Sequence, residues 1–193
     1  MKLIALDVAL LPPPDVAARA VELSAALPGD GHDRLRLDAN HLPHITLMQL
    51  FVREEELDAA LERVEGVVIG RPPLSLRVSG GGRGSSSVWM AIERTPAIDA
   101  PHEELMEALR GYERPGATPA AFFEGDARPG DVLWVTGYRL KSAFGAFTPH
   151  ITLGHAPAAP EIAPFDFVAS TVAGCHLGRF CSCRSVFRRW ELR

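Results

Sequence analysis

The sequence predicts an α+β fold with two pseudo-symmetric lobes, each a small, mainly antiparallel sheet with outer helices, and a central cleft between them. The first observation behind this is a repeat: PHITL occurs at 43–47 and again at 149–153. A chance identical pentapeptide has a probability of roughly one per cent in a chain of this length. The second observation is that each copy follows the same expected order, a strand and then a helix. We therefore expect a single bilobal domain over 1–193, with half-repeats of about 1–80 and 88–193.

The first half begins with an apolar run at 3–10 that only Asp7 interrupts and that prolines end, which predicts a strand. Apolar residues at helical spacing predict helices between 15 and 28 and from about 54 to 64, on either side of the first PHITL. A loop is expected through 29–31. Alternation at 74–78 predicts a further strand.

The second half is expected to start after GGGRGSSS at 80–87, which has the composition of a linker. A strand is predicted at 88–92, and Asp99 and Pro101 are expected to open a helix that Gly111 ends. A longer loop then leads to the second PHITL. The segments 167–176 and 183–192 are predicted to pair as a hairpin through the region of Gly178.

Composition limits the function classes. Acidic residues number 24 and basic residues 20, so the surface lacks the excess of positive charge that long phosphate backbones attract. A short nucleotide in a local pocket remains compatible with this balance. Asp7 and the prolines after it argue against a signal peptide, and no apolar stretch has the length of a membrane helix. We expect a soluble, cytoplasmic protein without membrane contact, and no obligatory protein partner is evident.

Three cysteines, Cys175, Cys181 and Cys183, lie close to His176. A zinc site is one interpretation, but the spacing is not a CxxC pair and a fourth ligand would have to come from another element. Reduced thiols packed in or near a hairpin are the favoured interpretation. No metal site is predicted.

The repeated motif carries the chemistry. Side chains alternate along a strand, so His44 and Thr46 share one face, as do His150 and Thr152. A pseudo-twofold axis would bring both pairs to the central cleft. Two opposed histidines can cleave a phosphodiester, since one takes a proton from water while the other protonates the departing ribose oxygen. The threonine hydroxyls can donate hydrogen bonds to the non-bridging oxygens.

Two H-x-T motifs about a hundred residues apart in matched halves resemble the 2H phosphoesterase superfamily, which includes 2'-5' RNA ligase-like proteins and cyclic nucleotide phosphodiesterases. The resemblance covers nearly the whole chain in its order of elements. It implies an enzyme that needs no metal or other cofactor and acts on a nucleotide or RNA end. His44, Thr46, His150 and Thr152 would be its catalytic residues.

The reaction expected from this resemblance is hydrolysis of 2',3'-cyclic phosphates of nucleotides or RNA ends. Alternatives are a 2'-5' RNA ligase, a 2'-5' oligonucleotide phosphodiesterase, or a non-catalytic RNA-binding protein of the same fold. Ligase-like members often have a basic residue soon after each motif. This chain instead has Met48-Gln49 and Gly154-His155 there.

Three further residues are candidates for substrate binding. Tyr138, on an expected strand-ending loop, could stack on a base, Lys141 could meet a phosphate, and Thr148 should share the face of His150. The neighbouring aromatic residues are more typical of a core, and the arginines at 184, 188 and 189 of a solvated face. Metal binding by the pairs His41/His44 or His150/His155 is not expected, because the members of each pair should face opposite ways on a strand.

Overall fold

A computed structural model describes residues 2–28 and 34–193 as a mixed α+β structure, so the predicted fold class is confirmed; the predicted loop at 29–31 lies outside the described residues. The strands are β1 (Leu3–Leu11), β2 (Ile45–Arg53), β3 (Leu74–Arg83), β4 (Ser87–Ile92), β5 (His150–His155), β6 (Phe165–Ala169), β7 (Thr171–Leu177) and β8 (Cys183–Glu191). The α-helices are α1 (Pro14–Ala25), α2 (Leu57–Val68), α3 (Pro96–Ala108) and α4 (Pro129–Lys141).

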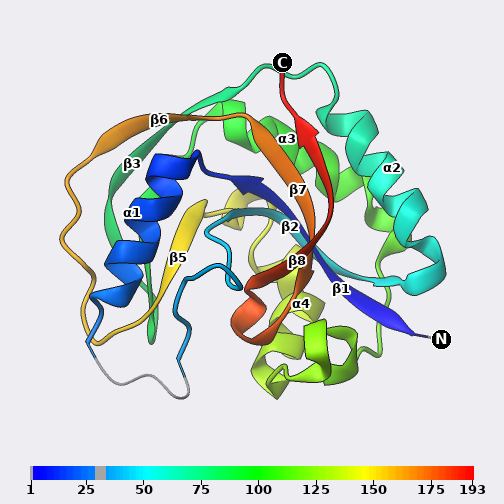
Figure 1. Cartoon of the computed structure of the whole chain (residues 1–193). Coiled ribbons are helices and arrows are strands. Elements are labelled where there is room, and N and C mark those ends of the chain that lie inside the picture. The colour runs from blue at the N-terminus through cyan, green and yellow to red at the C-terminus, as the bar shows by residue number, and fades with distance from the viewer. Residues whose placement is uncertain (1, 29–33) are drawn as a thin grey trace.

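The strands of the described part of the chain form one curled sheet in the order β6-β3-β4-β5-β2-β1-β7-β8 (Figure 1). Every neighbouring pair is antiparallel. The two strands that contain the PHITL motifs, β2 and β5, are adjacent at its centre and pair through Ile45 and Ile151. Each motif strand therefore begins a group of four strands, and the two groups meet where the motifs lie.

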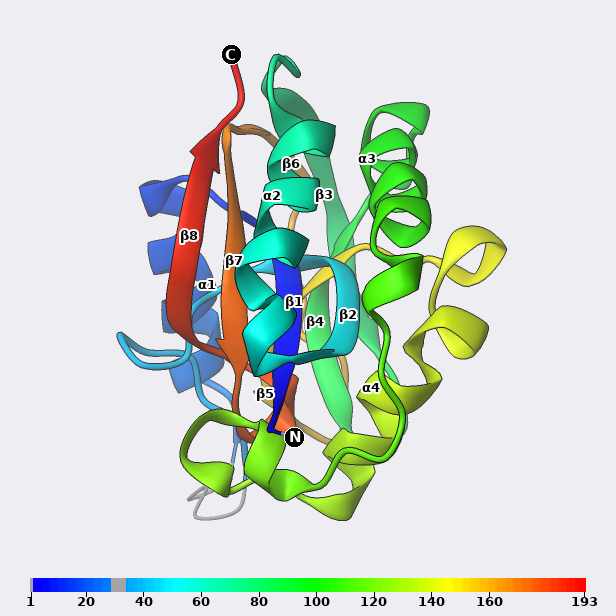
Figure 2. The same cartoon turned by 90° about the vertical axis from the view of Figure 1, so that its right-hand side faces the viewer.

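The two groups of strands do not follow the order of the chain. Strand β3 lies beside β4 in the group of the second motif, whereas β7 lies beside β1, and β8 beside β7, in the group of the first. Figure 2 shows β8, β7 and β1 side by side, with α2 in front of them. The segment 167–176, predicted as one strand, is divided at Ser170, where the chain passes from β6 to β7. The predicted hairpin through Gly178 is confirmed as β7–β8.

The prediction of a linker at 80–87 was wrong, because this segment belongs to the hairpin of β3 and β4. Its glycines are needed for close packing. A Cβ atom on Gly81 would lie 1.9 Å from the carbonyl oxygen of Pro160, and one on Gly82 would lie 2.0 Å from Nε1 of Trp89. The glycine-rich composition therefore lets a strand pass close to its neighbours rather than form a flexible connection.

Two helix predictions also need correction. The long loop expected before the second motif contains α4, so Tyr138 lies on a helix rather than on a strand-ending loop. Helix α3 begins at Pro96, earlier than Asp99, and includes Pro101. The apolar residues of α4 do not form a continuous buried stripe, because Leu133 and Leu140 are exposed. This weak helical periodicity explains why α4 was not predicted from the sequence.

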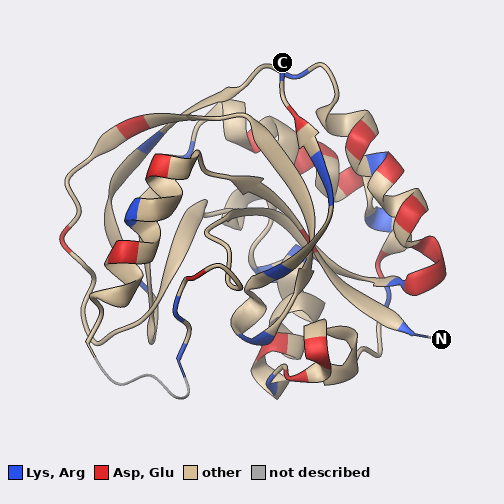
Figure 3. Ribbon diagram, viewed as in Figure 1, with Lys and Arg blue, Asp and Glu red and all other residues tan. Residues whose placement is uncertain are grey.

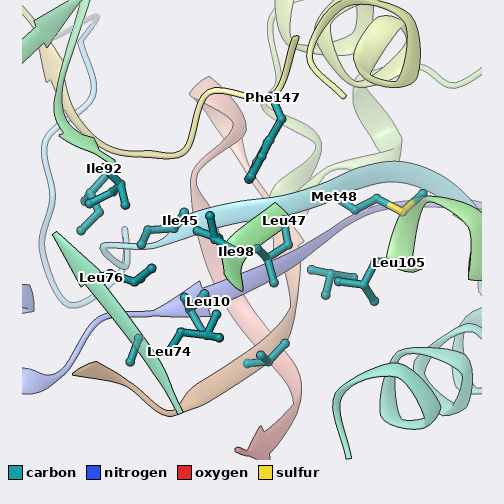
Figure 4. Close-up of a cluster of buried hydrophobic side chains, with 14 of the residues drawn as sticks. Leu10, Ile45, Leu47, Met48, Leu74, Leu76, Ile92, Ile98, Leu105 and Phe147 are labelled. Atoms are coloured by element: carbon teal, nitrogen blue, oxygen red, sulfur yellow. The ribbon is translucent and has the colours of Figure 1, made fainter. Parts of the chain in front are cut away.

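The core lies between the sheet and the helices, and Figure 4 shows its centre around Ile45, Leu47, Ile98 and Phe147. The helices pack across the two halves: α1 contacts β5, while α3 contacts β2. Each motif strand is thus held by a helix, and its buried residues, such as Ile45 and Ile151, are wholly enclosed. None of the helices in the described part of the chain has the length and apolar character that crossing a membrane requires.

Candidate active site

The two motif histidines make the same local hydrogen bond. Nδ1 of His44 lies 2.8 Å from the carbonyl oxygen of Leu42, and Nδ1 of His150 lies 2.7 Å from that of Thr148. A carbonyl oxygen can only accept, so each Nδ1 carries its hydrogen and donates it two residues back, across the intervening proline. In the neutral ring Nε2 is then the basic nitrogen. In both motifs Nε2 is therefore the nitrogen that this backbone bond does not use.

Each motif strand contains a one-residue β-bulge directly after its threonine. In the pairing of β1 with β2, Val8 is opposite Met48 and Ala9 is opposite Thr46, which leaves Leu47 as the extra residue. In the pairing of β4 with β5, the register passes from Gly154 to Thr152, which leaves Leu153. A bulge changes the face on which later side chains lie. The residue five positions after each histidine therefore joins the face of the histidine and threonine.

One cavity of about 610 Å³ receives both sets of side chains. The residues contributed by the two motif strands are His44, Thr46 and Gln49, and His150, Thr152 and His155. The expectation that His150 and His155 face opposite ways was wrong, because simple alternation does not hold across the bulge. The sequence showed glutamine and histidine after the motifs but not that both reach the cavity.

Helices α1 and α3 hold the two bulges through the buried polar side chains of Ser24 and His102. Leu153 accepts a hydrogen bond at its carbonyl from the Ser24 hydroxyl of α1, at 2.5 Å. Leu47 accepts one from Nδ1 of His102 on α3, at 2.6 Å, and Nε2 of His102 accepts the backbone N–H of Phe144 at 2.8 Å. Burial lowers the pKa of His102, which favours the neutral ring that these two bonds require.

We expect His102→Ala to lower the free energy of unfolding by about 3–5 kcal/mol, because it leaves a cavity and two backbone groups without their partner. The His102 ring also stacks on Phe147, with centroids 3.9 Å apart. Urea denaturation measures the loss, with His41→Ala as the control, since His41 contacts the exposed Asp38 instead of the core. A loss below about 1 kcal/mol, as for a surface substitution, would contradict this role.

A buried carboxylate lies beneath the first motif. Asp7 on β1 is 0% exposed, and its Oδ2 accepts hydrogen bonds from the Thr46 hydroxyl at 2.9 Å and from Nε2 of Gln49 at 2.7 Å. Nε2 of His44 lies 3.6 Å from the same oxygen. Gln49 in turn accepts the indole N–H of Trp134 at 3.1 Å. Asp7 was not predicted as a site residue, although it was the one charged residue in an apolar strand.

The second motif has a different environment. His150 packs beside the Trp89 ring, with centroids 5.0 Å apart. Burial and, to a smaller extent, the charge of His44 lower the pKa of His150, against the opposing effect of its bond to Thr148. The neutral, proton-accepting form of His150 is therefore favoured near pH 7.

In the neutral His155 ring the hydrogen is on the other nitrogen than in the two motif histidines. Its Nδ1 accepts the backbone N–H of Leu35 at 3.2 Å, so the neutral ring carries its hydrogen on Nε2. Burial and the nearby charge of Arg128 lower its pKa. His155 thus places a neutral hydrogen-bond donor in the cavity.

The three predicted substrate-binding residues, Tyr138, Lys141 and Thr148, all line the cavity. Tyr138 is 4% exposed and its hydroxyl lies 3.5 Å from the carbonyl oxygen of Leu47, so little of its ring is open to a base. Trp134 on the same helix is 48% exposed and offers a more accessible ring, as does the lining residue Trp89, which the sequence did not single out. The roles of all three predicted residues stay predictions.

Asp7, His44 and Cys183 each place one potential metal-ligand atom within 4.8 Å of the others. A structural zinc site has four ligands, and this group of described residues supplies three. Oδ2 of Asp7 already accepts two hydrogen bonds. Burial and the adjacent Cys175 raise the pKa of the Cys183 thiol, so a metal would have to displace the thiol proton in order to bind there. Cys175 and Cys183 lie in β7 and β8, within the hairpin predicted for them.

Comparisons with known proteins agree with the fold described above. The sequence matches the model of the family described as the 2'-5' RNA ligase superfamily over residues 12–173. No curated protein matches it. The crystal structure of TT0787 of Thermus thermophilus is similar with a TM-score of 0.64 and 21% identity, covering 98% of both chains. Escherichia coli LigT in apo form is similar with a TM-score of 0.63 and 18% identity, covering 100% of this chain and 99% of LigT. At these identities the two structures show a shared fold.

Proposed function

Because the chain belongs to the 2'-5' RNA ligase superfamily, we propose that it is a phosphodiesterase that hydrolyses 2',3'-cyclic phosphates of nucleotides or RNA ends without a metal ion. One observation carries the proposal: His44 and His150 line a single cavity, and each has its Nδ1–H fixed on a backbone carbonyl. This geometry supports a pair of imidazoles that exchange protons with one substrate through Nε2.

The proposed reaction needs two proton transfers and support for the phosphate. One histidine removes a proton from the attacking water, and the other gives a proton to the ribose oxygen that leaves phosphorus. Thr152 is proposed to donate a hydrogen bond to a non-bridging oxygen. The Thr46 hydroxyl donates to Asp7, so Thr46 is proposed to support the first motif by anchoring this carboxylate.

A nucleotide-sized substrate is proposed from the volume of the cavity and the charge of the protein surface. A cavity of about 610 Å³ falls within the usual range for small-molecule sites. Figure 3 shows acidic and basic residues mixed over the outer helices, with acidic ones prominent on α2, which does not favour a long RNA track. Escherichia coli LigT has been crystallised with 3'-AMP, and this supports a nucleotide ligand here. Lys141 is proposed to approach a phosphate, with Tyr138 and Thr148 nearby.

The direct test is to incubate the EDTA-treated protein with a dinucleotide that ends in a 2',3'-cyclic phosphate. Chromatography should show conversion to a single terminal phosphomonoester, either 2' or 3', because each enzyme protonates one leaving oxygen. Folded protein that yields no such product would refute the proposed hydrolysis.

The second candidate is 2'-5' joining of RNA ends, which uses the same proton transfers in reverse. The family match favours keeping it. Incubation with one RNA ending in a cyclic phosphate and one beginning with a 5' hydroxyl distinguishes the two, since only ligation yields a 2'-5' linked product. A non-catalytic RNA-binding protein would instead bind RNA in a salt-sensitive manner after both histidines are replaced, without turnover by the unmodified protein.

We expect the acid limb of the pH profile of kcat/KM to lie below pH 6.5, the ordinary value for histidine, because the pKa of His150 is lowered. A base with a lowered pKa stays deprotonated to a lower pH, so activity should persist through pH 6.5 and fall only below it. Measuring initial rates between about pH 4.5 and 9 locates this limb. An acid limb above pH 6.5 would contradict the assignment of a neutral His150.

A further inference from the structure

We infer that Asp7 makes the two motif histidines unequal: it is a positioning residue that places a buried carboxylate beside Nε2 of His44 alone, so that His44 acts as the acid and His150 as the base. This inference rests on the proposed function and deepens it. Two identical PHITL motifs give no reason for different roles. The difference must therefore come from the surroundings of each ring.

The first difference is a carboxylate at one histidine. Oδ2 of Asp7 lies 3.6 Å from Nε2 of His44, in a wholly buried position on β1. Two donors, from Thr46 and Gln49, converge on the same oxygen and hold it in place. A buried carboxylate without a counter-ion is costly, and His44 is the side chain beside Asp7 that can carry the opposite charge.

The second difference is visible in the strand pairing. Asp7 is opposite Gln49, five residues after His44, and Ser87 is opposite His155, five residues after His150. Ser87 is therefore the counterpart of Asp7 in the other group of strands, and it carries a neutral hydroxyl. The described residues give His150 no ion pair with a carboxylate like that of His44. The aromatic ring of Trp89 lies beside it instead.

The other groups near Asp7 do not supply a counter-charge. Burial raises the pKa of Cys181, Cys183 and Tyr138, and Asp7 raises each further, so all three stay neutral near pH 7. Burial also raises the pKa of Asp7, against the opposing effect of His44. Among the described groups that act on Asp7, His44 is thus the one that can become cationic.

The resulting step balances. Water forms a bond to phosphorus and gives its proton to Nε2 of His150, while the bond from phosphorus to the ribose oxygen breaks and that oxygen takes the proton from Nε2 of His44. Exchange with solvent after product release returns the proton from His150 and restores the one on His44. Asp7 touches neither water nor phosphate in this scheme, which makes it a positioning residue.

A substrate with a bridging sulfur tests the assignment. Replacing the departing ribose oxygen of the cyclic phosphate with sulfur gives a leaving group that needs no proton, and both the 2' and the 3' analogue should be prepared. We expect His44→Ala to reduce kcat by about 100-fold or more on the oxygen substrate and by less than about fivefold on the sulfur analogue. His150→Ala should reduce kcat by about 100-fold on both.

Asp7→Asn should follow the pattern of His44→Ala, with kcat about 10- to 100-fold lower on the oxygen substrate and little changed on the sulfur analogue. The amide oxygen can still accept from Thr46 and Gln49, so thermal melting should show a folded protein. KM should change little. Asp38→Asn is the matched control, since it removes a carboxylate 2.9 Å from His41.

Three outcomes are informative. Rescue of His150→Ala, rather than His44→Ala, by sulfur would reverse the assigned roles and overturn the inference. Equal losses for Asp7→Asn on both substrates would show that Asp7 acts through binding or folding, which also overturns it. Wild-type protein that opens neither substrate would instead refute the proposed function itself, and with it the reaction on which the inference rests.

Discussion

We expect His44→Ala and His150→Ala each to lower kcat on a 2',3'-cyclic phosphate by about 10² to 10⁴, the usual contribution of a positioned acid or base. Each substitution removes one ring whose Nδ1–H is fixed on a backbone carbonyl and whose Nε2 is left for the substrate. Both side chains lie at the cavity rather than in the core, so the fold should persist. Steady-state kinetics and circular dichroism on the same preparations measure both effects.

The matched control is His41→Ala. His41 lies three residues before the first motif histidine but contacts Asp38 and does not line the cavity, so kcat should remain within about twofold of wild type. An enzyme that loses less than about threefold on replacement of either motif histidine would rule out acid–base catalysis by this pair. Metal analysis of the purified protein provides a second check, since a stoichiometric transition metal at these histidines would require another mechanism.

The arrangement of the motif side chains could be predicted from the sequence because it depends only on residues that are neighbours along one strand. Alternation along a strand places His44 with Thr46 and His150 with Thr152, and all four line the cavity of the structure. The strands at 3–10, 74–78 and 88–92 were confirmed, since their apolar patterns are long or regular. The roles of the four residues in catalysis stay predictions.

The parts that the sequence did not show depend on contacts between distant segments. A β-bulge after Thr46 or Thr152 is a property of two paired strands, so the sequence of one strand does not reveal it. The approach of Gln49 and His155 to the cavity follows from these bulges. The position of Asp7 beside His44 likewise follows from the pairing of β1 with β2, which joins residues about forty positions apart.

The arrangement of the sheet was also beyond the sequence pattern. The repeated order of strand, helix and motif predicted two lobes, whereas the structure joins both motif strands in one sheet and places β3 with the second motif. The segment 80–87 was predicted to be a linker because glycine is common both in linkers and in hairpins. Only the nearby Trp89 side chain and Pro160 carbonyl, close to β3, explain why glycine is needed there.

The double variant His44→Ala/His150→Ala should have a kcat close to that of the slower single variant. This kcat is far above the value expected if the two separate losses multiplied. In one concerted displacement the acid helps only while the base delivers the nucleophile, so removing either ring removes most of the joint effect. The residual rate should come from the groups that still bind the phosphate, with Thr152 among them. A cycle of wild type, both single variants and the double variant, measured on one cyclic phosphate, gives the coupling directly. Losses that multiply in this cycle would mean that the two histidines act in separate steps, and the single-displacement scheme would then have to be abandoned.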